Sequence, residues 1–135
     1  MKRLQGFTLI ELSITLGIVA IIIAIATESY LSQAQKGRRS DAMDTISSIA
    51  LAQERYRSNN TTYGTLAQVW GGVTTTPGGY YTIGISAVTS SAYTITATAV
   101  GNQANDAENG TACNVLTFAV SNAAITQTPT VCWPQ

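Results

Sequence analysis

The chain opens with MKRLQGFTLIELSITLGIVAIIIAIATESY, residues 1–30, where one acid, Glu11, stands near the start of a long apolar segment. No charged residue follows between Leu12 and Thr27. An ionised carboxylate inside a bilayer costs on the order of 3 kcal/mol. We therefore expect Glu11 to have a partner that neutralises its charge.

This apolar segment is long enough to cross a bilayer. Phe7 to Thr27 is 21 residues, and a helix of that length extends about 31 Å, which matches the hydrocarbon thickness. A cleaved secretory signal has a shorter apolar core followed by a small-residue site, whereas Ala24-Ile25-Ala26 lies inside the apolar run. The basic pair Lys2-Arg3 precedes the span, so we expect a cytoplasmic N-terminus and an outward-facing remainder.

The hexapeptide Gly6-Phe7-Thr8-Leu9-Ile10-Glu11, between a basic leader and an apolar span, resembles the prepilin signature of type IV pilins and of type II secretion pseudopilins. The resemblance implies that a membrane-embedded prepilin peptidase cuts between Gly6 and Phe7 and that the new Phe7 amine is N-methylated. It also implies the type IV pilin fold. This is an α+β fold in which a long N-terminal transmembrane helix packs against a small antiparallel sheet.

The cut would create a cationic amine at Phe7, and methylation would leave it cationic. Opposite charges attract far more strongly away from water than in it. In an isolated subunit Glu11 is either protonated or paired with its own Phe7 amine, whereas in a helical bundle it can pair with a neighbour's amine. We interpret Glu11 as a register pin that fixes the axial stagger of subunits in a filament. The alternative is a tolerated polar residue at the membrane edge.

The composition favours a structural protein. The chain has 135 residues, seven basic and seven acidic residues and no histidine, which suits one spanning helix and one small outer domain. We find no nucleophile–base pair, phosphate loop or metal cluster, and so predict no enzyme, no catalytic residue and no cofactor. An even pair, Cys113 and Cys132, predicts one disulfide in an oxidising compartment. It would close a loop of about 20 residues and contribute roughly 3 kcal/mol.

The outer part of the chain is poor in positive charge. From Ser58 to Gln135 there is no Lys or Arg. Since nucleic-acid affinity rests largely on cations that neutralise phosphates, we do not expect nucleic acid to bind through this head. Any DNA contact would use Arg55, Arg57 or the basic run 36–39, which we interpret as an interfacial anchor or as a source of salt bridges to neighbouring subunits.

The loop at residues 105–110 contains two acids, Asp106 and Glu108. Secretion pseudopilins can hold Ca²⁺ in a head loop, but two carboxylates without the longer regular spacing of a calcium loop are weak evidence. We expect a solvated turn in which Asn109-Gly110 supplies positive φ angles, and no metal site.

Period-two alternation predicts strands at residues 80–87 and 92–100, with a third at 115–121 and a weaker fourth at 124–128. The helix should continue without a break to about Ser58. The expected organisation is a cleaved leader (1–6), a transmembrane and filament-core helix (7–30), and an outer head (31–135) made of helix 31–58, loop 59–79 and antiparallel sheet 80–135.

These observations predict a structural subunit of a type IV pilus, more specifically a minor pilin that takes part in pilus assembly, with roles in motility, adhesion or DNA uptake. The alternatives are a type II secretion pseudopilin and a pilus-associated adhesin or DNA-uptake pilin. The expected partners are other pilin subunits, the prepilin peptidase and the assembly platform. The expected location is the inner membrane before assembly and the pilus or cell surface afterwards.

Overall fold

The computed structural model describes residues 6–134, apart from the side chains of residues 27–29. The chain divides into two compact units, with the boundary between Ala34 and Gln35. Helix α1 (Leu9–Arg57) has 49 residues and contributes to both units.

In the first unit, α1 is apolar on all sides. Its most apolar 18-residue window has a mean hydropathy of 2.6, and none of that window is buried. By length and composition this helix could cross a membrane. At its start, the Thr8 hydroxyl accepts a hydrogen bond from the Glu11 backbone N–H at 3.3 Å, which satisfies one of the free donors of the first turn.

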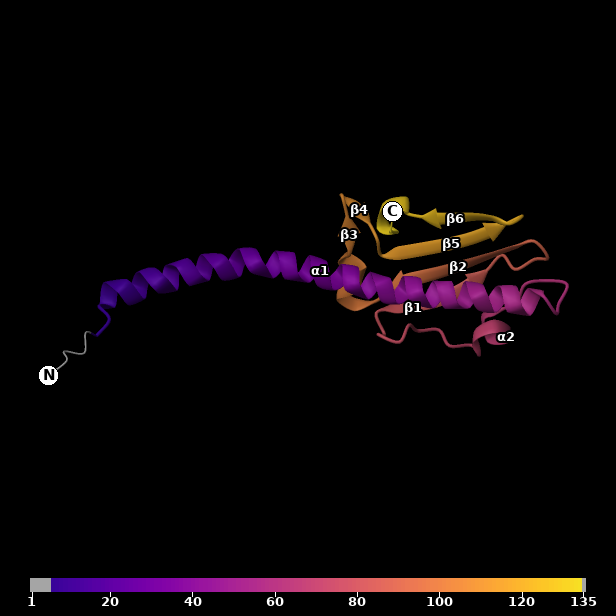
Figure 1. Ribbon diagram of the computed structural model, residues 1–135, viewed down its shortest axis with the longest axis horizontal. Helices are drawn as coiled ribbons and strands as arrows, with labels where there is room; N and C mark the ends of the chain where they lie inside the picture. Colours follow the sequence, from indigo (N-terminus) through magenta and orange to yellow (C-terminus); the bar gives the residue numbers. More distant parts are fainter. Residues whose placement is uncertain (1–5, 135) are drawn as a thin grey trace. The chain divides into compact units, whose positions relative to one another are not determined.

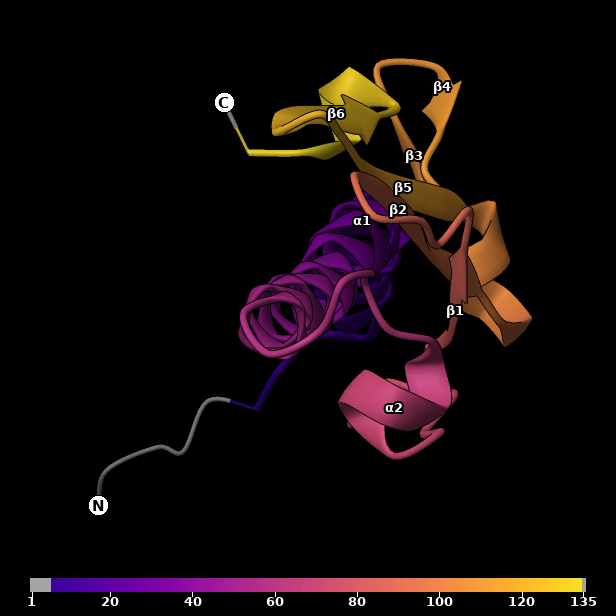
Figure 2. The same cartoon turned by 90° about the vertical axis from the view of Figure 1, so that its right-hand side faces the viewer.

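The second unit is built on a four-stranded antiparallel sheet. Its strands are β1 (Tyr81–Ser86), β2 (Ala92–Ala99), β5 (Val115–Ser121) and β6 (Ala124–Thr128), in the spatial order β1-β2-β5-β6. Figures 1 and 2 show this sheet running along one side of the later part of α1. Each strand pairs with the next one of this order, so the sheet is a simple meander.

Shorter elements surround this sheet. A short helix α2 (Leu66–Trp70) precedes β1, and a 3-10 helix η1 (Gly101–Asn105) follows β2. Strands β3 (Ala107–Glu108) and β4 (Thr111–Ala112) pair as a separate hairpin, and a second 3-10 helix η2 (Thr130–Cys132) follows β6.

The core lies between α1 and the inner face of the sheet. The helix contributes Ala42, Ile46 and Ile49, which recur at three- and four-residue steps and are fully buried. From the strands come alternate residues, because successive side chains of a strand point to opposite faces. The buried strand residues are Tyr81, Ile83, Tyr93, Ile95, Ala97, Ala99, Leu116 and Val120.

The predicted elements are largely confirmed. All four strands lie where alternation placed them, and α1 ends at Arg57. The segment 59–79 is not a plain loop, because it contains α2. Five residues are too few for helical periodicity to be recognised in the sequence. α2 ends at Trp70 and is capped by Gly71, whose φ of 66° lies in the left-handed region that glycine adopts without steric cost.

A buried side chain fastens this segment to α1. The Gln53 amide accepts from the Gly64 N–H at 2.8 Å and donates to the Gly64 carbonyl at 2.6 Å. Residue 64 has to be small, since a Cβ there would lie 2.5 Å from a Val69 methyl group and 3.1 Å from the Tyr56 ring. The segment at Gly64, which precedes α2, is therefore held on α1 by hydrogen bonds as well as by apolar contact.

The β5–β6 turn contains a strained residue. Asn122 and Ala123 have φ angles of 48° and 64°, as a two-residue hairpin turn requires, but alanine pays a steric cost in this region. We predict that Ala123→Gly raises the free energy of unfolding by about 0.5–1 kcal/mol. Urea titration of a fragment spanning residues 35–135, which contains the whole core, measures this. The matched control Ala119→Gly, within β5, should lower it, and a loss of stability in Ala123→Gly contradicts the strain argument.

Candidate functional site

The residues of the prepilin-like motif lie at the start of α1. Gly6 and Phe7 precede the helix, and Phe7 is 83% exposed. Glu11 lies in the first turn with an exposed side chain, and no hydrogen bond or ion pair joins its carboxylate to another described residue. The free N–H groups of a helix start carry partial positive charge and favour a carboxylate there. The leader residues 1–5 lie outside the described part of the chain.

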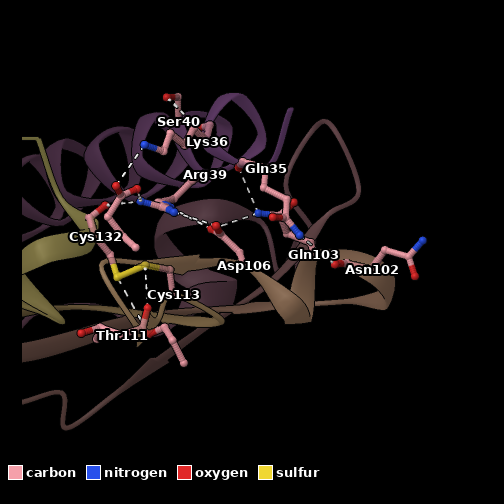
Figure 3. A network of polar contacts seen from close by, with 12 residues as sticks. Gln35, Lys36, Arg39, Ser40, Asn102, Gln103, Asp106, Thr111, Cys113 and Cys132 are labelled. Carbon is pink, nitrogen blue, oxygen red and sulfur yellow. Dashed lines mark hydrogen bonds and ion pairs between the residues drawn. A yellow bond between two sulfur atoms is a disulfide. The ribbon is translucent and has the colours of Figure 1, made fainter. Parts of the chain in front are cut away.

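A second group of polar residues lies in the head, around a buried ion pair. We call it the Arg39 cluster: Lys36 and Arg39 from α1, Gln103 from η1 and Asp106, which Figure 3 labels, together with Glu108 from β3. Arg39 donates from Nε to Asp106 Oδ2 at 2.8 Å and from Nη2 to Asp106 Oδ1 at 2.6 Å. Both side chains are almost fully buried, with 6% and 2% of their surface exposed. This two-pronged geometry is the strongest that an arginine and a carboxylate adopt.

Glu108 extends this ion pair to the surface. Its carboxylate accepts from Lys36 Nζ at 3.0 Å and from Arg39 Nη1 at 3.3 Å. The hydrogen bond from Lys36 and the charges of Lys36 and Arg39 lower the pKa of Glu108. In the same way, hydrogen bonding with Asp106 raises the pKa of Arg39 despite its burial. Both shifts favour the charged forms of Glu108 and Arg39.

Gln103 closes the inner side of the Arg39 cluster. Its Nε2 lies 3.2 Å from Asp106 Oδ2, 3.0 Å from the Tyr81 hydroxyl and 3.0 Å from the Gln35 carbonyl. Burial raises the pKa of Tyr81, so this hydroxyl is protonated. The amide thus connects α1, β1 and Asp106 through one side chain.

The predicted disulfide joins Cys113 and Cys132 at the same end of the head. The Cys113 N–H donates to the Asp106 carbonyl at 2.8 Å, and the Cys132 carbonyl accepts from Arg39 Nη1 at 3.5 Å. The disulfide joins the residue after β4 to η2, and the hydrogen bonds of Arg39 join α1 to Asp106 and to the Cys132 carbonyl in η2. Removing one partner of such a buried pair costs about 3–5 kcal/mol, because the other charge is left unpaired.

Two interpretations of the sequence are corrected here. The basic run 36–39 supplies ion pairs within the subunit, through Lys36 and Arg39, and these two residues are not left for lipid or for neighbouring subunits. The loop at 105–110 is not a simple solvated turn, because Asp106 is buried. Its tip is as expected, with φ angles of 49° at Asn109 and 78° at Gly110. Among the described residues no group of three or more potential ligands could hold a metal ion.

No local pattern in the sequence predicts the Arg39–Asp106 pair. The two residues are 67 positions apart, and nothing local marks Arg39 among its basic neighbours. One indirect clue is the distribution of charge. Residues 58–135 contain two acids and no basic residue, so a cation that pairs with a buried acid there has to come from another part of the chain.

Three cations of α1 have no acidic partner among the described residues. The guanidinium of Arg38 lies over the Tyr80 ring, 4.3 Å from its centroid. At the end of the helix Arg57 donates to the carbonyls of Ser90 at 3.1 Å and Asn60 at 2.6 Å. Arg55 is exposed, and no contact of its guanidinium is recorded in the described part.

The Arg39 cluster predicts an acid-sensitive head. A carboxyl group with a lowered folded-state pKa stabilises the fold above its unfolded pKa, and this contribution is lost as the pH falls through the folded value. We expect the unfolding midpoint in urea to fall between about pH 5 and pH 3, and to fall less in Glu108→Gln. The control Glu54→Gln removes an exposed carboxylate that contacts only the Tyr63 hydroxyl among described side chains. Equal acid sensitivity of wild type and Glu108→Gln contradicts the prediction.

Comparison with known families gives two matches. Residues 1–27 match the prokaryotic N-terminal methylation motif, and residues 28–117 match a family described as "Type IV minor pilin ComP, DNA uptake sequence receptor". No curated protein matches the chain. The second match covers the whole head part of α1, the Arg39 cluster, strands β1 and β2 and the first three residues of β5. The chain therefore belongs to the ComP family of type IV minor pilins.

Proposed function

We propose that this chain is cut between Gly6 and Phe7, methylated on the Phe7 amine, and built into type IV pili next to other pilin subunits. The observation that carries the proposal is the methylation-motif match at residues 1–27 directly before the minor-pilin match at 28–117. A prepilin peptidase performs the cut at the inner membrane, where α1 is anchored, and an assembly platform receives the subunit. The role is structural rather than catalytic.

In this proposal Glu11 sets the register of assembly. The Phe7 amine is a cation at the start of α1, where the partial positive charge of the free N–H groups makes it unfavourable. A carboxylate one turn away on a neighbouring copy neutralises it in a low-dielectric surrounding. The exposed Glu11 side chain is free of contacts to other described residues. Pairing between subunits then defines one axial offset among the many that apolar contacts alone would allow.

We predict that Glu11→Leu is cleaved and inserted but does not enter filaments. Cleavage is measured by the mass of the N-terminal peptide, and assembly by immunoblot of sheared pili. The control Gly6→Asp should fail at the earlier step and accumulate as the full-length precursor in the membrane. Normal amounts of Glu11→Leu in sheared pili contradict the register role, while leaving the cleavage step intact.

The proposal extends to DNA uptake, which the family description names for its members. Phosphate binding needs cations, and Arg39 and Lys36 already pair with acids. Arg57 has no acidic partner in the described chain, and its contacts hold its guanidinium between two polar segments, residues 58–62 and 89–91. These segments are rich in Ser, Thr and Asn, which donate hydrogen bonds to phosphate and sugar. We place the DNA contact at this end of α1.

One arginine among neutral donors predicts weak salt dependence. The logarithm of the binding constant should fall with the logarithm of salt concentration with a slope of about −1 for each phosphate neutralised. Fluorescence anisotropy of the 35–135 fragment with duplex DNA measures the slope, and Arg57→Gln should reduce its magnitude by about 1. The matched control Arg38→Gln, near the other end of the head, should leave it unchanged. If Arg38→Gln changes the slope and Arg57→Gln does not, the DNA contact lies near Arg38 instead. If the fragment shows no salt-dependent binding to duplex DNA, the proposed DNA role is refuted.

A further inference from the structure

Strand β6 has an open edge. In an antiparallel ladder, alternate residues direct their backbone N–H and C=O groups toward the same neighbouring strand. The two-residue turn of the β5–β6 hairpin fixes this alternation, so the backbone groups of Ala124, Thr126 and Thr128 face β5. Those of Ile125 and Gln127 point away from the sheet, and no hydrogen bond to them is recorded among the described residues.

The other edge of the sheet is covered by the chain itself. On β1, the Ile83 N–H donates to the Thr74 carbonyl at 2.7 Å, and the Tyr81 carbonyl accepts from the Thr76 N–H at 3.1 Å. Figure 1 shows β6 on the far side of the sheet from β1. Proteins usually protect such an edge with a lysine, a proline or a bulge, whereas the sequence of β6 is Ala-Ile-Thr-Gln-Thr. An open and uncharged edge is a template for one more strand.

An apolar groove lies beside this edge. Its volume is about 460 Å³, and it runs between α1 and the face of β5 and β6 that is turned toward the helix. Its lining includes Ala50, Leu51 and Glu54 from α1, Phe118 and Val120 from β5, and Ile125 from β6. Leu51 and Ile125 are 54% and 62% exposed. An added strand directs every second side chain to this face, so apolar side chains at those positions would cover both residues.

Glu54 gives the groove a negative charge. It is the one charged residue of the lining, and its exposed carboxylate accepts from the Tyr63 hydroxyl at 3.2 Å. Burial raises the pKa of Tyr93 to about 12, and the charge of Glu54 contributes to this rise. The carboxylate therefore acts on the groove, where it favours a ligand with a lysine or arginine. The long stem of such a residue can also cover apolar surface.

We propose that β6 and this groove bind an extended segment of another protein, which adds an antiparallel strand to β6. Its alternate apolar side chains enter the groove, and one basic side chain lies near Glu54. A second copy of this chain does not fit this description, because residues 58–135 contain no Lys or Arg and its strands cannot supply the cation. The site lies outside pilus assembly and outside the proposed DNA contact.

A synthetic peptide tests the strand addition. The probe is a labelled nine-residue peptide that alternates threonine with valine, with one valine replaced by arginine. Fluorescence anisotropy with the full chain in lipid nanodiscs should show saturable binding above that of empty nanodiscs. Opposite residues of an antiparallel pair share a face, so the peptide residues that bond to Ile125 and Gln127 are those whose side chains enter the groove.

Backbone N-methylation of the peptide then identifies the bonded residues. Methylation of the valines should abolish binding, and methylation of the threonines should change the affinity less than about two-fold, because their N–H groups face away from β6. Loss of binding with methylated threonines alone indicates a parallel strand and overturns the antiparallel arrangement. Equal effects of the two peptides, or no binding of the unmethylated one, overturn the strand addition.

Variants of the chain test the same contacts from the other side. Gln127→Pro removes an N–H that does not bond to β5, and it should weaken binding about five-fold, whereas Gln127→Thr keeps this N–H and should not. Glu54→Gln should weaken binding about three-fold, but not for a peptide with glutamine in place of arginine. Unchanged binding by Gln127→Pro overturns the proposal. Dimers of the wild-type chain in detergent that Gln127→Pro abolishes identify a second copy as the occupant, which also overturns it.

Discussion

The buried pair of Arg39 and Asp106 is the interaction on which the head depends. It joins α1 to the segment between β2 and β5. Two charges taken out of water are costly unless each is fully paired. The bidentate geometry, with Gln103 and Glu108 beside it, meets that requirement. The Cys113–Cys132 disulfide then joins the residue that follows β4 to η2.

Periodic patterns made the regular part of the fold predictable. Residues 80–87 and 92–100 alternate because one face of each strand is buried against α1, and the buried members Tyr81, Ile83, Tyr93 and Ile95 confirm this face. The helix was predictable to within a residue of its end for a similar reason. The prepilin-like motif is also local, since the leader, Gly6, Phe7 and Glu11 lie together in the chain.

What could not be predicted depends on contacts between distant positions. Arg39 is one of several basic residues in a short run, and only the folded chain shows that it is the one that pairs with Asp106. The same holds for Asp106, whose burial no neighbouring residue indicates. Helix α2 is too short to have a period, and its position depends on the Gln53–Gly64 hydrogen bonds. These features follow from tertiary packing, which no local pattern in one sequence encodes.

The distribution of charge separates the tasks of the head. Its five basic and five acidic residues, all at or after Lys36, cancel, so long-range attraction contributes little and each ion acts through its own neighbours. The pairs that are satisfied inside the subunit lie in the Arg39 cluster, and they stabilise the fold. The charged residues of α1 without an ion-pair partner among the described residues include Arg38 over the Tyr80 ring, Arg57 between two polar segments, and the exposed Asp44 and Arg55. An exposed ion without a partner in its own subunit can gain a contact outside it, and this is the reason for placing the proposed DNA contact at Arg57.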